Sequence, residues 1–168
     1  RRVECIRACR EEFGDRFVGG IQDDAFARRY AQDLIIPSAL TERSAFLDKV
    51  KESDICIATT GLHDSIGWKF AEYVAAARAI VSEPLKYELP GDFAESRNYL
   101  SFETKEELVS SIRRLSEDAG LMQNMMNENF RYYQTDLRSD MLILRTLLRV
   151  NDELSRNGSP DSHNRSNP

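Results

Sequence analysis

Hydrophobic positions along the chain fall into short continuous runs separated by longer segments with helical spacing. The clearest run is DICIATT, in which Ile55 to Ala58 are four consecutive apolar residues bounded by polar ones. Such a run is typical of a parallel strand that is covered on both faces. RAIVSE (78–83) and NYLSF (98–102) predict two further buried strands. Weaker strands are expected at RFVGGIQ (16–22), where paired glycines indicate close approach of another backbone, and at LIIP (34–37).

The segments between these runs have apolar residues three and four positions apart, which predicts amphipathic helices. The first helix ends before Gly14, the second has Asp23 or Asp24 as its N-cap, and a third has Thr41 as its cap. From Thr104 onward the pattern is wholly helical. The expected helices cover 1–13, 23–34, 40–53, 104–118, 120–134 and 136–154, and their expected inner residues include Ala45, Phe46, Val50, Leu108, Ile112, Leu115, Met122, Met125 and Met126.

Strands that alternate with helices of ten or more residues predict an α/β fold with a doubly wound, Rossmann-like parallel sheet. We expect one domain over 1–152, with a helical C-terminal end. Residues 153–168 are polar and rich in Ser, Asn and Pro, which predicts a disordered tail. The chain opens without Met and directly on a helix, so we expect it to be a fragment of a two-domain protein.

The composition limits the classes of binding partner that we expect for this chain. Of the 168 residues, 41% are hydrophobic and 30% charged, and the net charge of −5 predicts no nucleic-acid partner, although a local basic pocket remains compatible with it. No apolar run is long enough for an integral membrane segment and no signal peptide is visible, so we expect a cytoplasmic protein.

Cys5, Cys9 and Cys56 are three in number and lack the spacing of a metal site. Cys56 is expected in the core.

The turn after the run at 55–58 is polar and contains two glycines. In open α/β sheets, ligands bind beyond the carboxyl ends of the strands, where loops lead into helix N-termini. Gly61, His63, Asp64, Ser65 and Gly67 lie in this turn. We expect Asp64 or Ser65 to cap the following helix, and Gly67 to let backbone N–H groups approach an anion. The pattern predicts a phosphate site at this helix N-terminus.

The helix that follows is apolar except for one polar stripe. At about 100° per residue, Ser65, Lys69 and Glu72 fall on one side of it. A buried ammonium is costly without a counter-charge, so Lys69 needs Glu72, water or a bound anion. The alternative is an ordinary surface pair of Lys69 with Glu72, which stabilises a helix by only about 0.3 kcal/mol. Trp68 points away from the stripe and is expected in the core.

The residues from Asp54 to Phe102 resemble the C-terminal half of GT-B glycosyltransferases of the "group 1" type. That family carries two acidic residues eight positions apart, with a glycine between them, at the start of a helix after a buried strand. Asp64 and Glu72 have this spacing, and Gly67 lies between them. YVAAARAIVSE and NYLSFETKEELVSSIRRL resemble the helix end, the next strand and the later helix of the family, and the likeness extends over roughly 1–150.

The resemblance implies a nucleotide-sugar donor site. Glu72 would accept hydrogen bonds from the ribose hydroxyls, and Asp64 would contact hydroxyls of the transferred sugar. The turn from Ser65 to Gly67 would donate backbone N–H groups to the diphosphate, with Lys69 adding charge nearby. The resemblance further implies no metal, no cofactor other than the nucleotide-sugar substrate, and a separate N-terminal acceptor domain, without which this chain would not turn over substrate.

Three departures and three alternatives accompany this interpretation. Asp64 is shorter than the Glu common in the family, Ala77 and Ala79 replace its usual Gly and Pro, and its opening strand with a Gly-rich turn is not identifiable. A sugar-nucleotide epimerase on the same fold and a non-catalytic Rossmann-like interaction module are the main alternatives. A phosphoacceptor receiver domain would use Asp23 and Asp24, for which we prefer helix capping.

Overall fold

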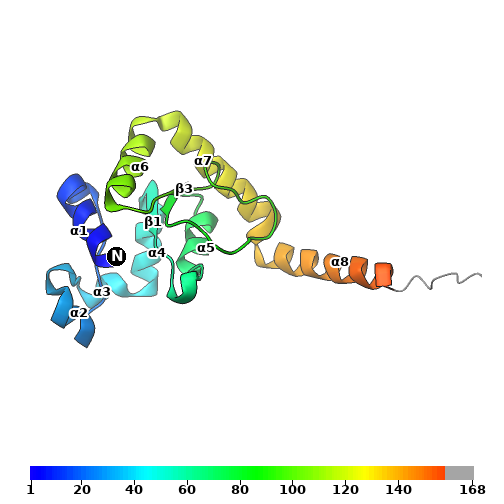
Figure 1. Ribbon diagram of the computed structural model, residues 1–168, viewed down its shortest axis with the longest axis horizontal. Helices are drawn as coiled ribbons and strands as arrows, with labels where there is room; N and C mark the ends of the chain where they lie inside the picture. The colour runs from blue at the N-terminus through cyan, green and yellow to red at the C-terminus, as the bar shows by residue number, and fades with distance from the viewer. Residues whose placement is uncertain (158–168) are drawn as a thin grey trace, which may run out of the picture.

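The computed structural model describes residues 1–157, which form an α/β fold around a small parallel sheet (Figure 1). The strand order is β1-β2-β3, and both pairs of neighbours are parallel. In the register, Ile55 is opposite Ala79, and Val81 is opposite Leu100. The strands are β1 (Ile55–Ala58), β2 (Ala79–Ser82) and β3 (Leu100–Ser101), which confirms the three buried strands that the apolar runs predict.

Helices make up most of the described chain. Gly14, with φ of 52°, follows the first helix, as predicted, because glycine adopts this left-handed conformation without a steric penalty. The α-helices are α1 (Arg2–Phe13), α2 (Ala25–Tyr30), α3 (Ser38–Thr41), α4 (Arg43–Glu52), α5 (Trp68–Ala75), α6 (Lys105–Glu117), α7 (Ala119–Tyr132) and α8 (Ser139–Asn157). Short 3₁₀ turns lie at η1 (Gly14–Arg16), η2 (Gln32–Leu34) and η3 (Leu62–Asp64), and a π-helical turn, η4 (Tyr133–Leu137), precedes α8.

The sheet is covered by helices on both faces, which explains its continuous apolar strands. On one face, α1 and α6 pack against β2 and β3 through Cys9 and Leu108. On the other face, α4 and α5 pack against Cys56 and Ile80 through Val50 and other apolar residues. Cys56 is 6% exposed and thus lies in the core as predicted. Burial raises the pKa of its thiol to about 12, so Cys56 is a packing residue and not a thiolate at neutral pH.

The two weaker strands are reduced to a single contact. Ile21 and Ile35 form an isolated parallel bridge, and neither 16–22 nor 34–37 is an extended strand. The predicted close approach of another backbone is present, because a Cβ on Gly20 would lie 2.7 Å from the Leu34 carbonyl oxygen. A Rossmann-like doubly wound sheet needs more strands than the three seen in the described residues, so the fold class is confirmed only as α/β with a parallel sheet.

The predicted helix caps were partly wrong. Asp24 caps α2, accepting a hydrogen bond of 2.7 Å from the Ala27 N–H. Thr41 does not cap α4, because its hydroxyl donates to the Ser38 carbonyl within the separate short helix α3. Thr104 forms a capping box with Glu107 at the start of α6, a feature that the sequence signature Thr-x-x-Glu specifies locally.

The C-terminal helices differ in how much they contact the sheet. The predicted inner residues Leu108, Leu115 and Met125 are buried, whereas α8 extends away from the sheet (Figure 1). Ile143, Leu144, Leu147, Leu148, Val150 and Leu154 are exposed apolar residues of α8. Helix α8 continues to Asn157, so the first five residues of the predicted disordered tail are helical, and the remainder, 158–168, lies outside the described residues.

Candidate functional site

The turn between β1 and α5 has an unusual backbone. His63 and Asp64 both have positive φ, 56° and 58°, a conformation that side-chain-bearing residues rarely adopt. Helix α5 begins only at Trp68, with Gly67 as its N-cap and no side-chain cap. The predicted capping by Asp64 or Ser65 was therefore wrong, and Ser65 lies outside the helix. Consecutive left-handed residues are found preferentially at functional sites, where the surrounding structure holds the strain.

The loop after β2 holds this turn in place. The Lys86 ammonium lies 2.8 Å from the Asp64 carboxylate, and the Tyr87 hydroxyl donates a 3.0 Å hydrogen bond to the His63 carbonyl. The hydrogen bond from Lys86 to Asp64, followed by their charge attraction, raises the pKa of Lys86. These contacts explain how the strained residues persist. They also show that Asp64, the predicted sugar contact, already has a cationic partner.

Glu72 is paired with a residue that the sequence did not single out. Its side chain is 14% exposed, and Arg43 Nη2 lies 2.7 Å from its Oε1. The Arg43 guanidinium also lies 5.1 Å from the centroid of the Trp68 ring. Trp68 itself is 60% exposed, so its predicted place in the core was wrong. The reason is that α5 begins at Trp68, which places this residue at the rim of the sheet and not over its face.

Two cations, Lys69 and Arg2, are near enough to influence each other's charge near the carboxyl end of β1. The Lys69 ammonium lies 4.9 Å from the centroid of the Phe46 ring, and Arg2 hydrogen-bonds the Thr59 hydroxyl at 3.2 Å. The pKa of Lys69 is lowered, first by burial and then by the positive charge of Arg2, while Glu72 opposes the shift. Neither Lys69 nor Arg2 forms an ion pair with a carboxylate among residues 1–157. Lys69 and Glu72 therefore do not form the simple surface pair that was the alternative.

The lowered pKa of Lys69 gives a pH-dependent prediction. Unfolded Lys69 keeps its proton up to its ordinary pKa of 10.5, whereas folded Lys69 releases it at lower pH. Stability therefore rises with pH between the two values. Replacing Lys69 by Met removes this contribution, so wild type should gain stability relative to Lys69→Met between pH 7 and pH 10.5. Urea unfolding at both pH values measures the difference, and a constant difference would contradict the prediction.

A buried carboxylate at the end of β2 was missed by the sequence reasoning. Glu83 is 5% exposed and accepts hydrogen bonds from the Thr60 N–H at 2.6 Å and the Thr60 hydroxyl at 2.9 Å. Arg1 Nε lies 2.7 Å from its other oxygen. The signal was available, because Glu83 directly follows a buried strand and so lies at the same carboxyl edge as Thr60. Arg2 and Arg43 carried no such signal, since neither follows a predicted strand of the sheet.

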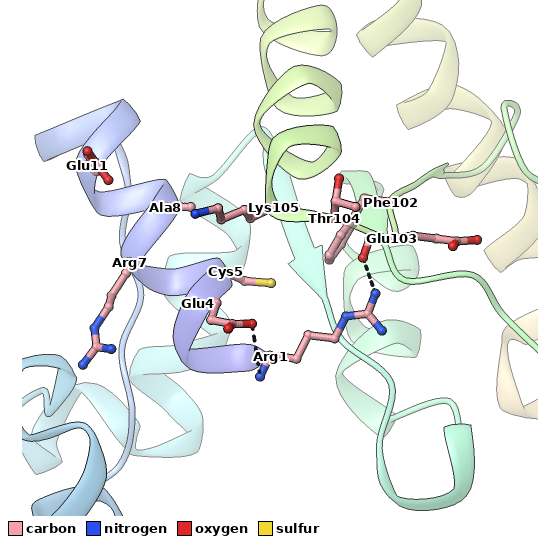
Figure 2. Close-up of a pocket in the computed structure, with 10 residues that line it drawn as sticks. All are labelled: Arg1, Glu4, Cys5, Arg7, Ala8, Glu11, Phe102, Glu103, Thr104 and Lys105. Carbon is pink, nitrogen blue, oxygen red and sulfur yellow. Dashed lines mark hydrogen bonds and ion pairs between the residues drawn. The ribbon is translucent and has the colours of Figure 1, made fainter.

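Neither of two hollows on the described surface is lined by a predicted site residue. The first, of about 380 Å³, lies between α1 and the start of α6, with Cys5 and Phe102 among its lining residues. Figure 2 shows Lys105 extending across it toward Ala8 and Arg1 reaching the Glu103 carbonyl. The second, of about 320 Å³, lies within the loop after β2. The predicted pocket between Asp64 and Glu72 is thus not among these hollows.

The remaining predicted site residues are accessible from solvent. Gly61 and His63 are exposed, and the Gly61 N–H donates to the Ser65 carbonyl at 2.8 Å, which closes the turn. Gly67 has open space where a Cβ would lie. These residues lie on the same turn as Asp64, as predicted, whereas Lys69 and Glu72 lie on α5 among the cations. Within residues 1–157, no cluster of three or more His, Cys, Asp or Glu side chains is placed to bind a metal ion.

The comparisons with known proteins add no relative. Neither protein-family models, nor curated proteins, nor solved structures gave a match to this chain. In the part of the chain that the structure describes, none of the helices combines the length and apolar character needed to cross a bilayer.

Proposed function

We propose that this chain is the sugar-nucleotide-binding half of a glycosyltransferase, acting with an acceptor-binding domain outside the sequence. The observation that carries the proposal is that Arg2, bound to Thr59 just after β1, and Lys69 on α5 repel each other and lack an ion-pair partner in the described chain. Two cations held together raise each other's energy, and a bound polyanion would relieve this cost. A nucleoside diphosphate supplies such a charge, and parallel sheets bind ligands at this edge.

The neighbouring residues support the same ligand. Glu72 offers a nearly buried carboxylate that accepts hydrogen bonds from the ribose hydroxyls in this proposal, and the strained turn at His63 and Asp64 lies between β1 and the helix that carries Glu72. In the proposed reaction, Arg2 and Lys69 stabilise the charge that develops on the departing nucleoside diphosphate. The donor is oriented by the turn from Gly61 to Gly67 together with the side chain of Glu72. No step in this scheme requires a metal ion, and the acceptor and its activating base belong to the second domain.

The test is a titration of the chain with UDP, GDP and ADP followed by backbone amide NMR. Shifts should be confined to Arg2 and residues 59–72 for at least one nucleotide. Lys69→Met should lower the affinity for that nucleotide about tenfold, because a hydrogen bond to a charged group contributes about 1.5–3 kcal/mol. Lys51→Met is the matched control, since Lys51 carries the same charge on an exposed side chain and pairs with Asp48. Uniformly small shifts, or equal losses in both variants, would refute the proposal.

One observation favours a second candidate, the non-catalytic interaction module. Helix α8 exposes six large apolar residues, whereas single scattered apolar residues are what an ordinary protein surface shows. Grouped exposed apolar residues are typical of a protein-binding surface. This candidate predicts no nucleotide affinity and full tolerance of Glu72→Ala. The same NMR titration separates the two candidates, because an interaction module would show no shifts at 59–72.

A further inference from the structure

The Glu72 carboxylate has unused capacity to accept hydrogen bonds. Both of its oxygens are buried, yet neither has a hydrogen bond of acceptable geometry from any residue between 1 and 157. Its contact with Arg43 is a charge contact of 2.7 Å that lacks hydrogen-bond alignment. Buried acceptors without donors are costly and uncommon, so each requires an explanation. The charge of Glu72 is balanced in the free protein, but its lone pairs are not satisfied.

Arg43 can leave this contact at low cost. Its side chain is 65% exposed, whereas that of Glu72 is 14% exposed. Arg43 is the first residue of α4, and its guanidinium lies over the exposed ring of Trp68. A guanidinium at the surface regains water when it leaves a carboxylate, which offsets much of the charge attraction that it loses. The carboxylate stays in place, because both of its oxygens are enclosed by the protein.

We infer that Arg43 is a specificity-determining residue that occupies Glu72 until a ligand with two adjacent hydroxyls displaces it. This inference rests on the proposed function and deepens it. The ribose hydroxyls of a nucleoside diphosphate donate to both Glu72 oxygens, which satisfies lone pairs that Arg43 leaves unused. A phosphate compound without hydroxyls, such as pyrophosphate, binds Arg2 and Lys69 but gives Glu72 no donor. The Arg43–Glu72 contact therefore selects nucleotides against simple polyphosphates.

Replacing Arg43 by Met tests this inference, because Met keeps an apolar stem near Trp68 and removes the competing charge. The nucleotide that wild type binds best should bind about 2- to 5-fold more tightly to Arg43→Met, the range expected from losing one partly exposed ion pair. Pyrophosphate should bind equally or more weakly, since a cation has been removed. Lys49→Met is the matched control: Lys49 lies on the same helix, pairs with Glu52, and does not contact Glu72. It should not tighten nucleotide binding.

Trp68 provides a direct signal for the displacement, because it is the only tryptophan. In wild type, nucleotide binding should change its fluorescence, whereas pyrophosphate should not, and in Arg43→Met the nucleotide-induced change should be lost. In a Glu72→Gln background, Arg43→Met should no longer tighten nucleotide binding.

The outcomes separate the inference from the proposed function. If wild type binds a nucleotide and Arg43→Met binds it equally or less tightly, the role of Arg43 is overturned and the proposed function stands. If folded wild type and Arg43→Met both fail to bind any of UDP, GDP and ADP, the proposed function and this inference are both overturned.

Discussion

Replacing Asn129 by Asp should lower the free energy of unfolding by about 3 kcal/mol, because the buried Asn98 carbonyl loses a donor worth about 2 kcal/mol and the partly buried Arg78 carbonyl one worth about 1 kcal/mol. The Asn129 Nδ2 group donates to the Arg78 carbonyl at 2.8 Å and to the Asn98 carbonyl at 2.9 Å. Asn129 is fully buried in α7. An ionised Asp has nearly the same shape but only acceptor atoms, so it would face both carbonyl oxygens without a proton.

Asn124→Asp provides the matched control, since Asn124 is an exposed residue of the same helix. It makes the same change of charge and should alter stability by less than about 0.5 kcal/mol. Urea unfolding followed by circular dichroism measures both variants. Equal stability of Asn129→Asp and Asn124→Asp would show that the hydrogen bonds of Asn129 to Arg78 and Asn98 do not hold α7 against the sheet.

Replacing Glu83 by Ala should lower the free energy of unfolding by about 2 kcal/mol. Removing one partner of a fully buried ion pair typically costs about 3–5 kcal/mol, and the lower value is expected because Arg1 is half exposed. The Thr60 N–H and hydroxyl lose their common acceptor. Because Thr60 leads into the strained turn, nucleotide binding should weaken as well.

Glu88→Ala is the control for this change. Glu88 is exposed on the loop after β2 and forms no ion pair within the described residues. It should leave both stability and nucleotide affinity unchanged. Thermal unfolding and the nucleotide titration are measured on the two variants together. Unchanged stability of Glu83→Ala would mean that Arg1 and Thr60 are equally well satisfied by water.

The local features of the chain were predictable where one residue type specifies one backbone state. Gly14 ends α1, Asp24 caps α2, and Thr104 with Glu107 begins α6, as side-chain chemistry within a few residues dictates. The turn before α5 was not predictable in this way. Asp64 and Ser65 are both good caps, yet the loop after β2 draws Asp64 to Lys86, and the helix begins only after Gly67.

In the candidate site, too, some features could be predicted from the sequence and others could not. Its expected position after β1 followed from the order of strands and helices, Lys69 from the polar stripe of the helix, and Asp64 and Glu72 from the spacing of the resembled family. Their partners did not, because Arg2, Arg43 and Lys86 reach the carboxyl edge from other elements. No local spacing connects Arg43 to Glu72 or Arg2 to Lys69. The assignment to a sugar-nucleotide-binding half stays a prediction that the nucleotide titration tests.

By itself, the sequence determined the elements of this protein: three buried strands, the helices around them and the apolar faces by which they pack. These follow from periodicity, because the spacing of apolar residues matches the repeat of the helix or strand that packs them against the sheet. Only the tertiary structure decided which charges meet. Ion pairs form between surfaces that folding brings together, and their geometry depends on distances across the whole chain. That is why Glu72 faces Arg43 and why Arg2 lies near Lys69 at the edge of β1.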